Sequence, residues 1–354
     1  MRRLPVFFVI DVSESMAGEP IQKVEEGLRT IITELKKDPY ALETVYISIV
    51  VFAGRAKTLV PLTDIISFYP PRFSIGAGTS YGEGVRHLID EINSKIKTTT
   101  ATSKGDWKPI IFFMTDGNPT DNYIIDIGRW EQTWKDKSNA IVISIGNQAD
   151  QKILRRISNN ILALDDSGPE AYQAFFKWVT ASVKAQSQKV EEHANDGELD
   201  MSGIDTSKMK KIEPMDEHQL KATDETFAIF FGKCQNKQSN YLIKYKKSTH
   251  ASEADVYPGL SVMNYRLQGS YALDEEYEKL STHESIQSVK AVSTEYLRGM
   301  PNCPSCGNRF ALCICQCGGI FCVDGEGVQT CPHCKQQGDF RAGDGHIDVS
   351  RQQG

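Results

Sequence analysis

Three groups of oxygen-bearing side chains stand at points of the chain where a metal ion could join them. Asp11, Ser13 and Ser15 alternate within Asp-Val-Ser-Glu-Ser, directly after an apolar run. Thr79 precedes a helical pattern, and Asp116 directly follows a second apolar run. Carboxylate and hydroxyl oxygens suit a hard cation, Mg²⁺ or in its place Mn²⁺ or Ca²⁺. The five side chains therefore predict a magnesium site in which one position stays open for water or an outside ligand.

Sulfur ligands gather at the other end of the chain. Of the nine cysteines, eight lie between Cys303 and Cys334, a crowding typical of a metal module rather than of a disulfide framework. Two Cys-Pro-x-Cys turns, at 303–306 and 331–334, have the spacing of zinc knuckles. We predict that one structural Zn²⁺ is held by Cys303, Cys306, Cys331 and Cys334.

The cysteines between the two knuckles leave alternatives open. Cys315, Cys317 and Cys322 offer ligands for a second zinc ion. Another arrangement pairs the knuckle at 303–306 with Cys315 and Cys317 and leaves the last knuckle for the other metal.

Other residues of this region have structural interpretations. The stretches 310–315 and 319–323 are expected to form the hairpin of a zinc ribbon. Cys313 and Cys234 are expected to be buried core thiols, because free cysteine buries readily. His333 is expected to point outward rather than to bind metal.

The oxygen ligands need a scaffold that brings their loops together, and the first 189 residues have the pattern of one. Strand-length apolar runs alternate with amphipathic helical patterns, and strands are expected at 4–11, 44–52, 109–115 and 140–146. Such alternation predicts a doubly wound, Rossmann-like α/β domain. In these sheets ligands bind beyond the carboxyl ends of the strands, which is where Asp11 and Asp116 stand.

The rest of the chain divides by composition. Residues 190–217 have almost no aliphatic or aromatic side chains and are interpreted as a linker. Residues 218–298 are expected to form a small β-rich domain, and residues 299–337 the Cys-rich zinc module. Residues 338–354, rich in Gly, Asp and Gln, are expected to be a flexible tail.

Composition limits the function classes. The 354 residues carry 40 Lys and Arg against 46 Asp and Glu, a net charge of −6, which argues against nucleic-acid binding through bulk charge. A hydrophobic share of 40% excludes disorder of the whole chain. No apolar run reaches the roughly 18 residues that span a bilayer. We therefore expect a cytoplasmic protein that does not bind membranes.

Phosphohydrolysis and nucleic-acid binding are two alternatives to a metal-dependent protein interaction. Phosphohydrolases also place a nucleophilic Asp after the first strand, as Asp11 is placed, and use Mg²⁺. They have a second carboxylate two residues later as the general acid, and Ser13 stands there instead. The zinc ribbon could also bind nucleic acid, but few basic residues flank it.

The arrangement of oxygen ligands resembles the metal-ion-dependent adhesion site (MIDAS) of von Willebrand factor type A (VWA) domains. The resemblance covers roughly residues 1–185 and rests on Asp-x-Ser-x-Ser, Gly-Thr-Ser at 78–80 and Thr-Asp-Gly at 115–117. It implies that Ser13 and Ser15 bind the metal directly. It further implies that Asp11, Thr79 and Asp116 bind directly or through water. A partner protein would supply an Asp or Glu carboxylate.

A VWA-like domain followed by a Cys-rich zinc module resembles the bacterial TerY proteins, which are associated with tellurite resistance and related stress gene clusters. The turn Thr-Asp-Gly-Asn-Pro-Thr-Asp at 115–121 and the two knuckles carry this resemblance. TerY-type proteins are linked to a protein kinase and a metal-dependent protein phosphatase. The resemblance therefore implies a non-enzymatic scaffold in an assembly that regulates phosphorylation.

Overall fold

A computed structural model describes most of the chain and divides it into two compact units, Met1–Ala222 and Thr223–Gly354. The described residues are 2–146, 149–164, 169–191, 199, 201, 203–205, 207, 209–212, 226–248, 264–282, 291–341 and 347–350. Among these residues no helix has the length and apolar character needed to cross a membrane.

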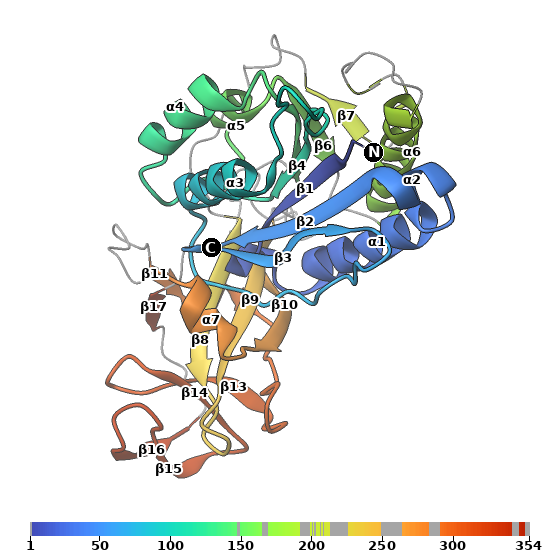
Figure 1. Cartoon of the computed structure of the whole chain (residues 1–354). Helices are drawn as coiled ribbons and strands as arrows, with labels where there is room; N and C mark the ends of the chain where they lie inside the picture. Colours follow the sequence, from blue (N-terminus) through green and yellow to red (C-terminus); the bar gives the residue numbers. More distant parts are fainter. Residues whose placement is uncertain are drawn as a thin grey trace. The chain divides into compact units, whose positions relative to one another are not determined.

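The first unit is built on a seven-stranded sheet with the order β3-β2-β1-β4-β5-β6-β7 (Figure 1). Its strands are β1 (Leu4–Asp11), β2 (Val45–Phe52), β3 (Ala56–Asp64), β4 (Ile110–Thr115), β5 (Asn139–Ile145), β6 (Asn160–Leu164) and β7 (Met209–Lys211). The central strands pair in parallel, and the edge strands β3 and β7 are antiparallel to their neighbours. The predicted doubly wound α/β domain is confirmed.

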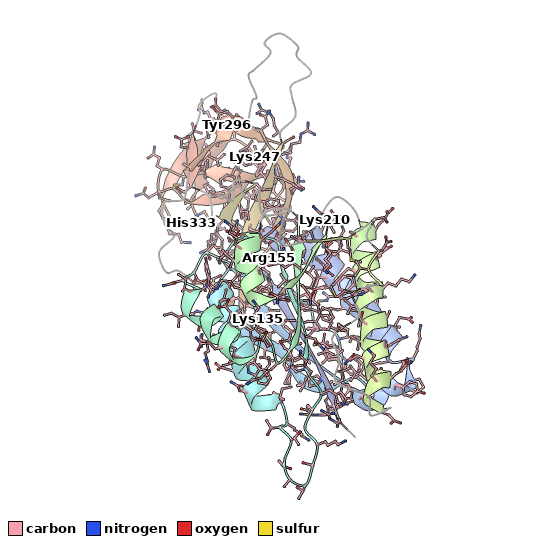
Figure 2. All side chains as sticks on the ribbon, turned by 90° about the horizontal axis from the view of Figure 1, so that it is seen from above. Lys135, Arg155, Lys210, Lys247, Tyr296 and His333 are labelled. Carbon is pink, nitrogen blue, oxygen red and sulfur yellow. The ribbon has the colours of Figure 1, made fainter. Side chains whose placement is uncertain are left out.

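Helices cover both faces of this sheet (Figure 1). They are α1 (Glu19–Leu35), α2 (Pro39–Thr44), α3 (Tyr81–Lys95), α4 (Ile124–Thr133), α5 (Gln151–Ile157) and α6 (Pro169–Glu191), with a 3₁₀ turn, η1 (Glu14–Met16). Helices α3, α4 and α5 pack side by side on one face, and α1, α2 and α6 on the other. On the α4–α5 side, Lys135 Nζ donates to the carbonyl of Arg155 at 2.7 Å (Figure 2).

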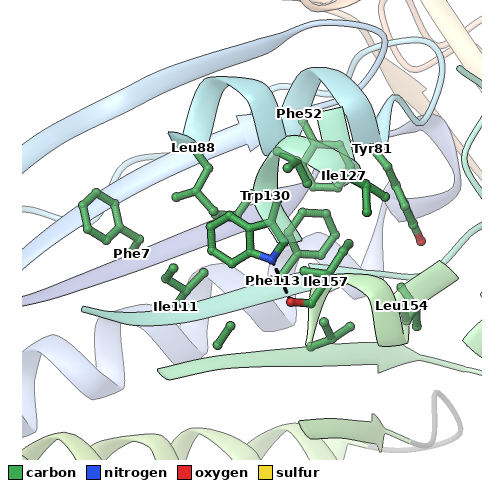
Figure 3. Close-up of a cluster of buried hydrophobic side chains, with 14 of the residues drawn as sticks. Phe7, Phe52, Tyr81, Leu88, Ile111, Phe113, Ile127, Trp130, Leu154 and Ile157 are labelled. Carbon is green, nitrogen blue, oxygen red and sulfur yellow. Dashed lines mark hydrogen bonds between the residues drawn. The ribbon is translucent and has the colours of Figure 1, made fainter. Parts of the chain in front are cut away.

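The core under α3, α4 and α5 is dense in aromatic side chains (Figure 3). The ring of Phe113 packs against those of Phe52 and Tyr81. Its centroid lies 5.1 Å from that of Phe52 and 5.6 Å from that of Tyr81. Trp130 is buried, and its Nε1 donates to the carbonyl of Ile157 at 2.8 Å, so its polar atom is satisfied. This packing joins the end of β2 and strand β4 to the start of α3.

Strand β7 corrects the prediction that 190–217 is only a linker. Met209 pairs with Leu164 of β6, and the Ile212 amide donates to the Ile161 carbonyl at 3.0 Å. Met209 and Ile212 are buried. These two apolar residues are enough to anchor a short edge strand. They were not recognised in the sequence because the rest of the segment is polar.

The second unit is built on a six-stranded sheet with the order β12-β10-β9-β8-β14-β13. These strands are β8 (Phe227–Lys233), β9 (Asn240–Ser248), β10 (Asn264–Ala272), β12 (Leu297–Arg298), β13 (Phe310–Ile314) and β14 (Ile320–Val323). The hairpin β13–β14 confirms the predicted ribbon hairpin. Because β14 pairs with β8, the predicted boundary between 218–298 and 299–337 falls inside one sheet and is wrong.

Two short ribbons and two single turns complete this unit. They are β11 (Ala291–Ser293) with β17 (Asp348–Ser350), β15 (Gly327–Thr330) with β16 (Gln337–Phe340), α7 (Glu276–Leu280) and η2 (Thr294–Tyr296). Val349 of β17 and Val292 of β11 are both buried in the core of the unit. The predicted flexible tail therefore contains an ordered strand, because one buried valine anchors it.

Candidate functional site

The oxygen-bearing side chains lie at the switch point of the first sheet. Strand β1 has β2 on one side and β4 on the other, so the chain leaves the carboxyl ends of β1 and β4 in opposite directions. Asp11 is the last residue of β1, and Asp116 follows Thr115, the last residue of β4. A crevice opens at such a point in doubly wound sheets.

A hydrogen-bonded chain links the two carboxylates. The Ser13 amide donates to Asp11 Oδ1 at 2.9 Å, and the hydroxyls of Ser13 and Ser15 lie 2.9 Å apart. Ser15 Oγ then donates to Asp116 Oδ1 at 2.7 Å. All four residues are buried. The sequence prediction that the Asp-x-Ser-x-Ser loop meets Asp116 agrees with this geometry.

Two residues that the sequence analysis missed hold Asp11 from the other side. Thr115 Oγ1 donates to Asp11 Oδ2 at 2.7 Å. The Tyr81 hydroxyl lies 3.1 Å from Thr115 Oγ1 and donates to the carbonyl of Gly117 at 2.6 Å. The signal for Thr115 was its place directly before Asp116. Nothing in the sequence distinguishes Tyr81 from other aromatic core residues.

The loop that carries Thr79 is tied to the loop after β4. The Thr79 amide donates to Thr120 Oγ1 at 2.9 Å, and the Thr120 amide donates to the Thr79 carbonyl at 2.8 Å. Gly78 has φ +91°, and a Cβ there would lie 3.3 Å from the Cα of Gly54, so this turn requires glycine. Thr79 Oγ1 is buried and has no hydrogen-bond partner among the described residues.

The electrostatics of this site favour a cation. Burial, followed by the charge of Asp116, raises the pKa of Asp11 to about 7. Burial also raises the pKa of nearby Asp121 to about 6, although the Gly82 amide donates to its carboxylate at 2.8 Å. A bound cation would stabilise the ionised carboxylates and supply a partner for Thr79 Oγ1. The donor set of carboxylate and hydroxyl oxygens therefore fits a hard metal ion. That these five residues are its ligands stays a prediction.

The cysteines form two sets of four in the second unit. The first set is Cys234, Cys303, Cys306 and Cys322, and the second is Cys315, Cys317, Cys331 and Cys334. Within each set the sulfur atoms all lie within 4.8 Å of one another, as four thiolates around one zinc ion require. All nine cysteines are free of disulfides.

These sets correct the predicted grouping of the two knuckles around one ion. The knuckle at 303–306 meets Cys322 and Cys234, because β14 runs beside β8 and brings Cys322 to the end of that strand. The other knuckle meets the turn of the β13–β14 hairpin, which carries Cys315 and Cys317. A second metal site, left open by the sequence, is therefore supported, with Cys322 in the first set.

Cys234 is the member of these two sets that sequence reasoning missed. It is buried as expected, but its sulfur lies 3.9 Å from that of Cys322. The amides of Lys237 and Gln235 donate to the sulfurs of Cys234 and Cys322 at 3.3 and 3.4 Å, as knuckle amides do. The missed signal was a cysteine at the end of a strand followed by a polar turn, Gln-Asn-Lys-Gln.

Cys313 and His333 lie outside both sets. Burial raises the pKa of Cys313 to about 11, which favours an inert neutral thiol. His333 Nε2 lies 2.9 Å from the carbonyl of Ile320, so its ring supports the hairpin and is absent from the two sulfur clusters.

Comparisons with known proteins follow the division into two units. The von Willebrand factor type A domain family matches residues 6–176. The TerY-C metal binding domain family matches residues 224–354. These two domains match those of a TerY-type VWA protein. Because VWA domains are generally non-catalytic interaction modules, a VWA domain joined to a TerY-C domain supports a metal-dependent interaction scaffold.

The individual proteins that resemble this chain share only a small part of its sequence. Pig (Sus scrofa) inter-alpha-trypsin inhibitor heavy chain H1 is 29% identical over 119 residues, which are 33% of this chain and 13% of that protein. A von Willebrand factor type A structure from Catenulispora acidiphila has 16% identity and a TM-score of 0.40, covering 52% of this chain and 43% of its own. Mussel proximal thread matrix protein 1, solved with a zinc-occupied MIDAS motif, has 16% identity and a TM-score of 0.37, covering 51% and 48%. The chain spans less than half the length of each.

Proposed function

We propose that this TerY-type protein is a non-enzymatic scaffold whose VWA domain binds a partner through a metal ion. Mg²⁺, or Mn²⁺ or Ca²⁺ in its place, would be held by Asp11, Ser13, Ser15, Thr79 and Asp116. The observation that carries the proposal is the buried pair Asp11 and Asp116, linked through Ser13 and Ser15, together with Thr79 Oγ1, which is buried without a hydrogen-bond partner among the described residues. Because hydroxyl ligands are neutral, the cation keeps part of its positive charge. A carboxylate of a partner protein can balance that charge.

The surface beside this site has the character of a docking area. Ile124 and Ile125, at the start of α4, are 60% and 77% exposed. This start packs against the start of α3, since a Cβ on Gly82 would lie 3.2 Å from Tyr123 Cα. Thr79 lies three residues before Gly82. A partner segment that offers Asp or Glu to the metal and an apolar side chain to the isoleucines fits this surface.

The two sulfur clusters have a structural part in the proposal. Four thiolates close the coordination of Zn²⁺ and leave no position for a substrate. Two such ions would stabilise a unit whose sheet joins segments from 227 to 323. Since thiolate ligands require a reducing environment, we place the protein in the cytoplasm.

The resemblance to TerY proteins suggests the kind of partner. We propose a protein kinase, a metal-dependent protein phosphatase, or both, in a bacterial assembly associated with tellurite resistance. Hydrolysis by Asp11 is disfavoured because Ser13, two residues later, provides a hydroxyl in place of the carboxyl group of a general acid.

Affinity purification with the tagged full-length chain tests the proposal. Columns are washed with Mg²⁺ or without it, since a strong chelator would also strip zinc, and captured proteins are identified by mass spectrometry. We expect a kinase or phosphatase that binds only with Mg²⁺ and is lost with Ser13→Ala or Thr79→Ala. Ser94→Ala, in an exposed serine on α3, is the matched control. Equal capture by all variants with and without Mg²⁺ would overturn the proposal.

A further inference from the structure

The second unit contains a pocket that neither the metal sites nor the VWA surface uses. It has a volume of about 540 Å³ and is lined by Ser248, Asn264, Arg266, Leu267, Arg298 and Gly299. It lies where β9, β10 and β12 run side by side, near Lys247 and Tyr296, which Figure 2 labels. We call it the Arg266–Arg298 pocket.

Strand pairing places the two arginines next to each other. Arg266 of β10 is in register with Arg298 of β12, and both side chains are exposed. Arg298 Nη1 donates to the carbonyls of Glu295 and Leu297, which orients its guanidinium. Within the described part of the chain, no carboxylate forms an ion pair with either arginine. Two adjacent guanidiniums without a counter-charge repel each other, so a bound anion would stabilise both.

Neutral polar groups complete the lining. Ser248 is in register with Asn264, so a hydroxyl and an amide face the pocket from neighbouring strands. A serine hydroxyl and the Nδ2 of an asparagine are both donors to an oxyanion. The register also places Lys246 opposite Arg266, which adds positive charge on the same face.

Gly299 keeps the backbone close to this site. Its φ of +98° is the left-handed conformation that glycine adopts without strain, and a Cβ there would lie 3.0 Å from Leu267 Cβ. The residue after Arg298 therefore lies tightly against β10. This contact fixes the distance between the strands that carry the two guanidiniums.

We propose that the Arg266–Arg298 pocket binds a phosphoryl group. Paired guanidiniums present forks of N–H donors that match the oxygens of a phosphate bidentately. Among the described residues, the lining has no acidic side chain that would repel a dianion, and the volume exceeds that of the phosphoryl group itself, leaving room for the molecule that carries it. None of the described lining residues is aromatic and able to stack on a base, which favours a phosphorylated side chain or a free phosphate ester over nucleic acid.

Calorimetry with the zinc-loaded full-length chain tests this assignment. The probes are inorganic phosphate, phosphoserine within a short peptide, the same peptide with serine, and a single-stranded oligonucleotide. We expect saturable binding of the phosphopeptide but not of the serine peptide. Arg266→Gln and Arg298→Gln should each weaken it at least about tenfold, because a hydrogen bond to a charged group contributes about 1.5–3 kcal/mol. The affinity of Arg266→Lys should lie between those of the unmodified chain and Arg266→Gln, since lysine keeps the charge but lacks the forked pair of N–H donors.

Controls separate this site from the rest of the molecule. Arg309→Gln, in an exposed arginine of the same unit, should leave the affinity unchanged. If inorganic phosphate binds as tightly as the phosphopeptide, the pocket recognises the phosphoryl group alone. If the phosphopeptide binds more tightly, the pocket recognises a phosphorylated side chain. The proposal is overturned if no phosphate probe saturates, if the Gln variants bind normally while remaining folded, or if only the oligonucleotide binds, with steep salt dependence.

Discussion

The sulfur of Cys234 lies 3.9 Å from that of Cys322, although 88 positions separate the two residues in the sequence. Together with the knuckle at 303–306 they form one of two four-cysteine sets. A metal bound by this set would therefore join the end of β8 to β14 and to the knuckle at 303–306. The cluster therefore cross-links segments of the second unit that are far apart in the sequence, which the two knuckles alone would not do.

Cys234→Ser should reduce the zinc content of the full chain from two ions to one. Serine leaves three thiolates, and the loss of one ligand greatly weakens a closed tetrahedral site. Native mass spectrometry measures the stoichiometry directly. Cys313→Ser is the matched control and should retain two ions, since Cys313 belongs to neither set. Retention of two ions by Cys234→Ser would contradict the grouping and would restore the pairing of the two knuckles.

In magnesium-free buffer the melting temperature should fall as pH rises from about 4 to about 7. The folded-state pKa of Asp11 is about 7, above its ordinary value of 3.8, so the native state holds this proton more tightly than the unfolded state. The stabilisation is present in acid and disappears as Asp11 ionises beside Asp116. Added Mg²⁺ should flatten this profile, because the cation pairs with the ionised carboxylate.

Asp11→Asn provides the control for that profile. Without Mg²⁺ it should melt higher than the unmodified chain above pH 7, because it removes one of two buried negative charges. With Mg²⁺ the order should reverse, because the amide is a poorer ligand than the carboxylate. Parallel pH profiles for the two proteins, unaffected by Mg²⁺, would show that Asp11 does not titrate as described.

The meeting of the Asp11 loop with Asp116 was predictable and the grouping of the cysteines was not, for a physical reason. Asp11 and Asp116 follow strands of one parallel sheet, and the alternation of strands and helices already places such strand ends at one edge. The partners of each knuckle depend instead on β8 pairing with β14, a contact between segments far apart in the sequence. Local patterns carry no information on that pairing. The ordered strand β17 was missed for the same reason.

Ile125→Ser should weaken partner binding at least about tenfold with little effect on stability. The side chain is 77% exposed, so its replacement removes almost no core packing, while a central apolar contact in an interface often contributes about 2 kcal/mol or more. Quantitative pull-down with Mg²⁺ present measures the effect. The matched control is Ile66→Ser. Ile66 is 61% exposed and follows β3. The end of β3 pairs with the start of β2, so Ile66 lies at the other end of the strands from Asp11. Equal losses in both variants would place the interface elsewhere.

Gly27→Ala should destabilise the first unit by about 1–3 kcal/mol, the usual range for overpacking a core. Gly27 lies on α1 where this helix meets α6, and a Cβ there would overlap the ring of Phe176. Alanine ordinarily stabilises a helix relative to glycine by about 0.5–1 kcal/mol, so the steric cost must exceed that gain. Gly128→Ala on α4 isolates the helix effect, because the nearest atom to its Cβ would be Arg156 Nη2 at 3.9 Å. Urea unfolding should therefore move in opposite directions for the two variants. A more stable Gly27→Ala would mean that α1 and α6 pack less closely than described.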